Sequence, residues 1–290
     1  MKYLFVLIVS LFLTSCAAKK QTINTEKNTS EAATIETKKA ESTTIIEEPE
    51  SQNETVLESE EEIIPLPPKP PKRLSNYKDV MHNRWNKILQ KHVSESGNVD
   101  YKGIKNESEF DVYIDYLSET LPDDNWTKDE KLAYWINAYN ALTVDLILRH
   151  YPVKSIKDIK DPWDQRLWQF GDKWQNLNDI EHKILREMNE PRIHFAIVCA
   201  SISCPNLQNE AFTASNLETQ LTEATKEFLK DSTKNELTED HIKLSKIFKW
   251  FKKDFEHDGN LIDFLNQYAD LKISSSAKKS FKDYNWNLND

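Results

Sequence analysis

Residues 128–150 read KDEKLAYWINAYNALTVDLILRH, and this stretch decides the fold. Thr127 and Glu130 predict a capping box, in which each side chain satisfies a free backbone donor at the helix start. Tyr151-Pro152 marks the helix end. Apolar residues occur almost all the way around this helix, which is typical of a helix buried in the centre of a domain. The sequence therefore predicts a domain built around one central helix.

Shorter elements are expected on both sides of the central helix. Amphipathic patterns predict helices at 79–93, 108–118, 178–189, 216–230, 246–256 and about 260–269. Extended pieces are expected at 98–104, 167–177 (a hairpin turning at Gly171-Asp172), 192–200 and 241–244. Because strands and helices do not alternate regularly, we expect a helix-rich α+β single domain with a small mixed or antiparallel sheet.

The first residues have the pattern of an export signal. An apolar run follows Lys2 and ends in Leu13-Thr14-Ser15-Cys16, which looks like the lipobox of a bacterial lipoprotein. We therefore expect a signal peptide over 1–15 and lipid attachment to Cys16. This predicts a membrane-anchored lipoprotein of the cell envelope, periplasmic or at the outer membrane, with the membrane as a partner.

A change of composition separates the expected anchor from the expected domain. Residues 16–73 are rich in Thr, Ser, Glu and Lys and end near a proline cluster at 65–71. Few of these side chains can bury apolar surface, so we expect a disordered tether. The remaining residues, 74–290, suit one globular domain.

Charge and glycine content exclude several classes of function. The formal net charge is −10, which argues against nucleic acid as a partner. The chain has only four glycines, and the closest pair, Gly97 and Gly103, lacks both the P-loop ending and the dinucleotide fingerprint. We therefore expect no nucleotide cofactor. The oligomeric state is left open.

The stretch PRIHFAIVCASISCPNL, residues 191–207, carries one histidine and two cysteines among apolar residues. As a strand, 192–200 would be buried on both faces. The chain must turn back after Ala200 before His194 and Cys204 can meet. Pro205 can start a helical turn, which would put Cys204 at a helix N-terminus and lower the pKa of its thiol. Cys199, in the middle of the strand, is expected to be an inert core thiol.

Several sites are compatible with these residues. A Cys199–Cys204 disulfide is allowed in an exported compartment. A zinc site from both cysteines with His194 and His182 is conceivable, although no CxxC or HxxxH spacing supports it. A thiol nucleophile at Cys204, with His182 or His194 as its base, would give a function to more of these polar residues than the disulfide or the zinc site. A pure scaffold without chemistry is the remaining alternative.

Three further polar residues fall on apolar helix faces. Glu181 lies within the apolar face of the predicted helix 178–189 and needs a buried partner such as a histidine, Arg192 or backbone donors. Asn137 and Asn140 share one side of the central helix with apolar neighbours, so their amides must also find hydrogen-bond partners. Bracing an irregular loop is the more ordinary role for the two amides, and a catalytic role is the alternative.

Six ordered motifs resemble the domain-of-unknown-function 547 family. They are Trp135-Ile136-Asn137-Ala138-Tyr139-Asn140, Leu177-Asn178-Asp179-Ile180-Glu181-His182, Arg192-Ile193-His194-Phe195-Ala196, Ser203-Cys204-Pro205, Ser245-x2-Phe248-x-Trp250-Phe251-x2-Asp254-Phe255 and Tyr284-Asn285-Trp286-Asn287-Leu288-Asn289. The resemblance extends from about 125 to 290 and implies no established reaction. Its signature residues are Asn137, Asn140, Glu181, His182, His194 and Cys204. They look like a Cys-His-Glu or Cys-His-Asn arrangement of the papain or transglutaminase kind, in a permuted chain order.

We therefore expect a cysteine-dependent hydrolase or acyltransferase acting on an amide or thioester, such as a peptide or a cell-wall fragment. Cys204 would attack the carbonyl carbon and His182 would take the thiol proton, with His194 as the second choice of base. Glu181 or Asn137 would orient the imidazole. This hypothesis includes no cofactor and no metal ion. The alternatives are a non-enzymatic envelope binding or assembly module with a structural Glu-His-Cys network, and a metal-binding protein using His194, Cys199 and Cys204.

Overall fold

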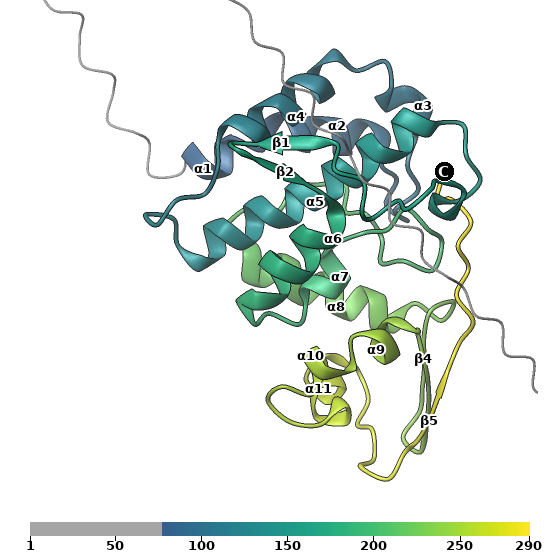
Figure 1. Ribbon diagram of the computed structural model, residues 1–290. Coiled ribbons are helices and arrows are strands. Elements are labelled where there is room, and N and C mark those ends of the chain that lie inside the picture. The colour runs from purple at the N-terminus through teal and green to yellow at the C-terminus, as the bar shows by residue number, and fades with distance from the viewer. Residues whose placement is uncertain (1–76) are drawn as a thin grey trace, which may run out of the picture. The chain divides into compact units, whose positions relative to one another are not determined.

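The computed structural model describes residues 77–290, and helix α5 (Lys128–His150) runs through their middle (Figure 1). Thr127 Oγ1 accepts a hydrogen bond from the Glu130 amide, and the Glu130 carboxylate accepts one from the Thr127 amide, which confirms the capping box. Every residue from Leu132 to Leu148 is buried. A helix that is apolar on all sides must be covered on all sides, so α5 determines where the other elements pack.

The elements around α5 are short. Those before it are the helices α1 (Tyr77–Val80), α2 (Asn83–His92), α3 (Tyr101–Ile104) and α4 (Ser108–Glu119). Those that follow it are η1 (Ile156–Asp158), β1 (Trp168–Phe170), β2 (Lys173–Gln175), α6 (Leu177–Ile180), η2 (Glu181–Leu185), η3 (Arg186–Met188), α7 (Ile193–Ala196) and α8 (Leu217–Lys230). The last part of the chain contains β3 (Glu236–Leu237), β4 (His241–Leu244), α9 (Ile247–Trp250), α10 (Lys252–Phe255), α11 (Leu261–Tyr268) and β5 (Lys278–Phe281).

Two small sheets complete the α+β fold. Strands β1 and β2 form an antiparallel hairpin, with Phe170 opposite Lys173, as the sequence predicts. In the second sheet β4 lies between β3, its antiparallel neighbour, and β5, its parallel neighbour. The predicted helix-rich α+β class with a small mixed sheet is confirmed. The expected relation to papain or transglutaminase folds stays a prediction.

The buried apolar side chains form two clusters. One surrounds α5 and contains Trp85 and Tyr134, among many others. The other lies under α8, β4 and α9 to α11, and Phe195 of α7 is at its centre, with its ring against those of Phe228 and Phe248. Because α7 contributes side chains to both clusters, the chain that follows it runs along their boundary.

The C-terminal segment ties the two clusters together. After β5 the chain runs back past the loops of the first cluster and ends near α3 (Figure 1). Along this path the Asn287 carbonyl accepts a hydrogen bond from the Ile202 amide at 2.9 Å, and the Leu288 amide donates to the Lys154 carbonyl at 2.8 Å. This return path brings Tyr284 and Trp286 next to the segment that carries the two cysteines.

The predicted strand 192–200 is wrong. Residues Ile193–Ala196 form the helical turn α7, and the chain becomes extended only from Ile197. A short buried apolar run does not distinguish a strand from a helix, because both bury every side chain. The turn back after Ala200 is confirmed, since the Cys204 amide donates to the Ser201 carbonyl at 2.9 Å.

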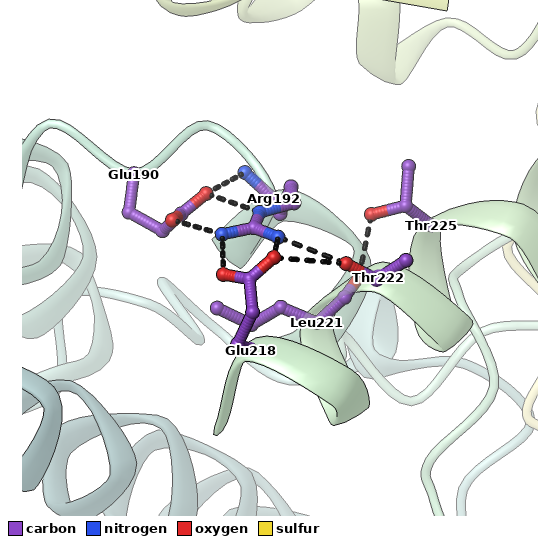
Figure 2. A network of polar contacts seen from close by, with 6 residues as sticks. All are labelled: Glu190, Arg192, Glu218, Leu221, Thr222 and Thr225. Atoms are coloured by element: carbon purple, nitrogen blue, oxygen red, sulfur yellow. Dashed lines mark hydrogen bonds and ion pairs between the residues drawn. The ribbon is translucent and has the colours of Figure 1, made fainter. Parts of the chain in front are cut away.

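An ion-pair network fixes the start of α7 (Figure 2). The Arg192 guanidinium donates to both oxygens of Glu190 and to both oxygens of Glu218 on α8. These bonds raise the pKa of Arg192 further above its usual value. Arg192 is therefore not the partner of Glu181, which was one of the expectations; it joins α7 to α8 instead.

Three other elements differ from expectation. Within 98–104 only Val99 makes a strand-like bridge, and Tyr101–Ile104 is helical. The predicted helix 246–256 is interrupted at Phe251 into α9 and α10. The predicted helix 178–189 begins as α-helix, continues as the π-helical turn η2 and ends as the 3₁₀ turn η3.

The predicted signal peptide, Cys16 and the tether lie outside the described residues. Within residues 77–290, no helix combines the length and apolar character needed to cross a membrane.

Asn137 and Asn140 brace irregular backbone, as the more ordinary expectation had it. In the Asn140 side chain, Nδ2 donates to the Ala196 carbonyl at 2.9 Å and Oδ1 accepts from the backbone amide of Val198 at 3.0 Å. Asn137 makes the same pair of bonds to the carbonyl and amide of Phe212. Both side chains are at most 1% exposed, so the segments after α7 and before α8 take their position from α5.

We predict that Asn140→Ala lowers the free energy of unfolding by about 2–6 kcal/mol, because it leaves two buried backbone groups without a partner and each costs about 1–3 kcal/mol. Urea unfolding followed by circular dichroism measures the change. Thr127→Ala is the control on the same helix and should cost about 1 kcal/mol, the usual loss for an N-cap. Equal losses in the two variants would contradict the bracing role of Asn140.

Candidate functional site

A pocket of about 330 Å³ opens where the two apolar clusters meet. Its walls come from α5, η2, the segment 197–205, α9 and the C-terminal segment. It contains four of the predicted site residues, namely Glu181, His182, His194 and Cys204, together with Cys199. Asn137 and Asn140 are not among its lining residues. A larger hollow of about 660 Å³ beside α2 and α4 contains no cysteine and no histidine.

The two cysteines lie in contact within this pocket. Ala200, between them, has φ +55°, a left-handed conformation that is uncommon for a residue with a side chain. This kink and the turn from Ser201 to Cys204 place the two sulfur atoms 2.6 Å apart. The Cys199 amide also donates to Cys204 Sγ at 2.8 Å. Both cysteines are free thiols in this structure, so the disulfide alternative is not formed here.

The two thiols differ in their surroundings. Cys204 is 5% exposed, and its S–H donates to Cys199 Sγ. Burial and the bond to Cys199 raise the pKa of Cys204 well above its usual value. Burial also raises the pKa of the half-buried Cys199, but its hydrogen bonds with Cys204, Ser201 and Tyr284 outweigh burial and lower this pKa overall. Cys199 is therefore the more acidic and the more accessible thiol.

This reverses the expected order of acidity of the two cysteines. The acidity of Cys204 was expected from a helix beginning at Pro205, but the next helix, α8, begins at Leu217. Without a helix there is no dipole to stabilise a thiolate at Cys204. The expectation that Cys199 is an inert core thiol rested on the strand 192–200, which does not form.

Glu181 is the first residue of the π-helical turn η2 and is 8% exposed. Its Oε2 accepts a hydrogen bond from the Tyr139 hydroxyl of α5 at 3.0 Å. Burial raises the pKa of Glu181 to about 7, although the bond from Tyr139 lowers it slightly. Neither a histidine nor Arg192 is its partner, and a π-turn at such a residue is a common feature of functional sites.

His182 and His194 are the two ends of one chain of polar contacts. Arg186 of η3 donates to His182 Nδ1 at 2.8 Å and makes a two-pronged ion pair with Asp254 of α10. Asp254 Oδ2 lies 2.8 Å from His194 Nε2. The bonds from Arg186 and His194 outweigh burial and hold the pKa of Asp254 below its usual range. The His194 ring is also stacked on Phe251, with 3.9 Å between the ring centres.

The tautomer of His182 follows from its contact with Arg186. A guanidinium can only donate, so Nδ1 must be the acceptor and the neutral ring carries its proton on Nε2. Burial and the positive charge of Arg186 both lower the pKa of His182, which keeps the ring neutral. Within residues 77–290, Nε2 of this ring makes no hydrogen bond, and the side chain lines the pocket.

The expected base and its orienting residues are arranged differently. Neither imidazole forms a hydrogen bond to either cysteine sulfur within the described part of the chain. Glu181 contacts Tyr139, and Asn137 contacts the backbone of Phe212, so neither orients His182. Arg186 does so instead.

Four polar residues of the site were not singled out from the sequence. They are Tyr139, Arg186, Asp254 and Tyr284. Three of them occur within the motifs quoted above, where Tyr139 lies between the two asparagines. Arg186 follows His182 by four residues, the spacing that brings side chains together on one helix face.

The described residues contain no group of three or more His, Cys, Asp or Glu side chains placed to hold a metal ion. His194, Cys199 and Cys204 all line the pocket, but His194 points its Nε2 at Asp254 rather than at a sulfur. The metal-binding alternative therefore gains no support from the geometry.

Residues 124–229 match the sequence model of a protein family described as "Protein of unknown function, DUF547". The resemblance expected from the motifs is confirmed over this segment. The DUF547 segment contains α5, Glu181, His182 and both cysteines, whereas Asp254 and Tyr284 lie beyond it. No curated protein and no solved structure matches the chain.

The raised pKa of Glu181 predicts a pH-dependent stability. Because this pKa is about 7 in the folded protein and 4.5 is its usual value, the folded state binds more protons between these pH values. The free energy of unfolding therefore falls as the pH rises through this window. Glu181→Gln lacks this titration. The free energy of unfolding of the variant minus that of the original protein should therefore increase by up to about 3 kcal/mol from pH 4.5 to pH 8.

Urea unfolding of both proteins at several pH values tests this prediction. Glu187→Gln, which removes an exposed carboxyl from the neighbouring turn η3, is the matched control for the loss of one charge. A difference between Glu181→Gln and the original protein that does not change with pH would show that Glu181 titrates normally.

Proposed function

We propose that the pocket is the active site of a cysteine-dependent hydrolase or acyltransferase that acts on an amide or a thioester, with Cys199 rather than Cys204 as the nucleophile. One observation carries the proposal: the accessible thiol of the pocket is surrounded by three groups that hydrogen-bond to its sulfur. Such donors stabilise the thiolate, which is the nucleophilic form of cysteine.

Cys199 needs no histidine base in this proposal. Its pKa is already lowered by Cys204, Ser201 and Tyr284, so part of the population is thiolate before substrate binds. The thiolate attacks the carbonyl carbon and forms a tetrahedral intermediate, whose collapse leaves an acyl group on Cys199. This explains why a cysteine can act here without a hydrogen bond from His182 or His194.

His182 acts as a donor in this proposal. Its Nε2–H, fixed by the bond from Arg186 to Nδ1, faces the pocket and can stabilise the negative charge that develops on the carbonyl oxygen. The amides of Cys199 and Cys204, which would otherwise be candidates for this role, are bonded to Cys204 Sγ and the Ser201 carbonyl. His182 therefore supplies the donor that these two backbone amides do not offer.

Glu181 is the proposed acid and base. A carboxyl with a pKa of about 7 exchanges protons readily near neutral pH. Protonated Glu181 gives its proton to the departing amine or thiolate. As a carboxylate it then takes a proton from the water or acceptor that attacks the acyl group on Cys199. Tyr139 holds the carboxyl in position throughout.

The lipid anchor at Cys16, the envelope location and a peptide or cell-wall-like substrate are parts of the same proposal. They rest on the lipobox-like residues and on the tether composition. One observation favours a different class, an envelope binding module with a structural polar network: His182 and His194 are bonded to Arg186 and Asp254 rather than to sulfur.

We predict that iodoacetamide modifies Cys199 in the folded protein with an apparent pKa below the usual value of 9.0, while Cys204 stays unmodified until the protein unfolds. Tyr284→Phe removes one hydrogen-bond donor and should move the apparent pKa of Cys199 upward. Peptide mapping by mass spectrometry measures both cysteines separately. Preferential modification of Cys204 would contradict the proposed nucleophile.

We also predict that a small acyl thioester transfers its acyl group to Cys199. Intact-protein mass spectrometry should detect the adduct in the full-length chain and none on Cys199 in the Cys199→Ala variant. Glu181→Gln should accumulate the adduct, because deacylation loses its base, whereas Glu187→Gln should not. The absence of any adduct in the original protein and in Glu181→Gln would favour the binding module.

A further inference from the structure

The two sulfur atoms of the pocket have the arrangement of a reactive thiol next to a second thiol that can close a disulfide. Cys199 and Cys204 are five positions apart, yet the left-handed Ala200 and the turn at 201–204 bring their sulfurs to 2.6 Å. A disulfide bond has a length of about 2.05 Å. The thiols therefore need only a small further approach, which the short loop between them can supply.

The two thiols differ in exposure, as is required when one thiol reacts first and the second closes the disulfide. Cys199 is half-buried and lines the pocket, so a small molecule that enters can reach its sulfur. Cys204 is 5% exposed and its S–H is directed at Cys199. Reactive redox cysteines are accessible, stabilised as thiolates and often located beside a second cysteine that resolves the oxidised form.

We propose that the pocket reacts with hydroperoxides, with Cys199 as the oxidised residue and Cys204 as the residue that resolves it to a disulfide. This activity is separate from acyl transfer and uses no part of the Glu181 or His182 chemistry.

The reaction has two steps. In the first, the Cys199 thiolate attacks the terminal oxygen of a hydroperoxide, the O–O bond breaks, and Cys199 becomes a sulfenic acid. The departing alkoxide or hydroxide takes a proton from water in the pocket. In the second, Cys204 Sγ attacks Cys199 Sγ and the S–O bond breaks. The departing hydroxide takes the thiol proton of Cys204 and leaves as water. The two sulfurs together lose two electrons, and the peroxide is reduced by two electrons.

Hydrogen peroxide added to the full-length chain tests this proposal. After the reaction, remaining thiols are blocked with iodoacetamide and the protein is cleaved with trypsin. Residues 193–226 form a single tryptic peptide that contains Cys199 and Cys204, while Cys16 falls in another. We expect this peptide to appear unblocked and lighter by two hydrogen atoms than its reduced form. Dithiothreitol should restore two alkylatable thiols.

Two variants distinguish the roles of the cysteines. In Cys204→Ala, the sulfenic acid on Cys199 has no resolving partner, so dimedone should label Cys199. In Cys199→Ala, dimedone should label nothing in the same peptide, because Cys204 is buried. Urea unfolding of both variants controls for loss of the fold, and the mass change of the unsubstituted protein does not depend on either variant.

Two results would overturn the proposal: a peptide 193–226 that remains fully alkylatable after peroxide, or dimedone labelling of Cys204 in preference to Cys199. A disulfide between this peptide and the one containing Cys16 would also overturn it, because the resolving thiol would then be a different one. The acyl-thioester experiment uses no oxidant, so a failure of peroxide oxidation leaves that test unaffected, and the reverse also holds.

Discussion

The Asn140 side chain is the interaction on which the position of the site depends. The chain leaves α7 at Ile197 as buried irregular backbone and pairs with the C-terminal segment only from Ser201, so its backbone groups before Ser201 must find other partners. The Asn140 side chain satisfies one backbone acceptor and one backbone donor, because it donates to the Ala196 carbonyl and accepts from the Val198 amide. Cys199 is the next residue. The thiol of Cys199 is thus positioned by the buried helix α5.

A second constraint acts across the pocket. Arg186 and Asp254 form a two-pronged ion pair that joins η3 to α10, and each also contacts one of the histidines. Both partners are partly shielded from water, so desolvation offsets much of their attraction and the pair contributes little net stability. The role of this ion pair is to position side chains. The charge of Asp254 holds the guanidinium in place, and the guanidinium in turn fixes the tautomer of His182.

The sequence predicted those parts of the fold that depend on local periodicity and capping. The ends of α5, the hairpin β1–β2 and the strand β4 all follow from such signals. It failed at 192–200, where an apolar run suits a buried helix as well as a buried strand. It also failed at Phe251, where the break between α9 and α10 places the ring over His194. That break is a tertiary feature, and no local pattern indicates it.

Four residues from the sequence motifs line one pocket: Glu181, His182, His194 and Cys204. Their hydrogen-bond partners could not be predicted from the sequence. Each decisive partner comes from a distant element: Tyr139 for Glu181, Asp254 for His194 and Tyr284 for Cys199. The contact of Asp254 requires the docking of α10, and that of Tyr284 requires the return of the C-terminal segment.

The different acidities of the two cysteines show why the pKa of a thiol is difficult to derive from sequence. A helix N-terminus can be predicted from Pro205, and its dipole would have acted on Cys204. The groups that hydrogen-bond to Cys199 are a neighbouring thiol and two hydroxyls that only the folded chain assembles. A low local dielectric strengthens the hydrogen bonds of a buried group, and at Cys199 they lower the pKa although burial opposes them. Cys199, the more exposed thiol with three hydrogen-bonding neighbours, is therefore the more acidic, and the enclosed thiol of Cys204 is one of its donors.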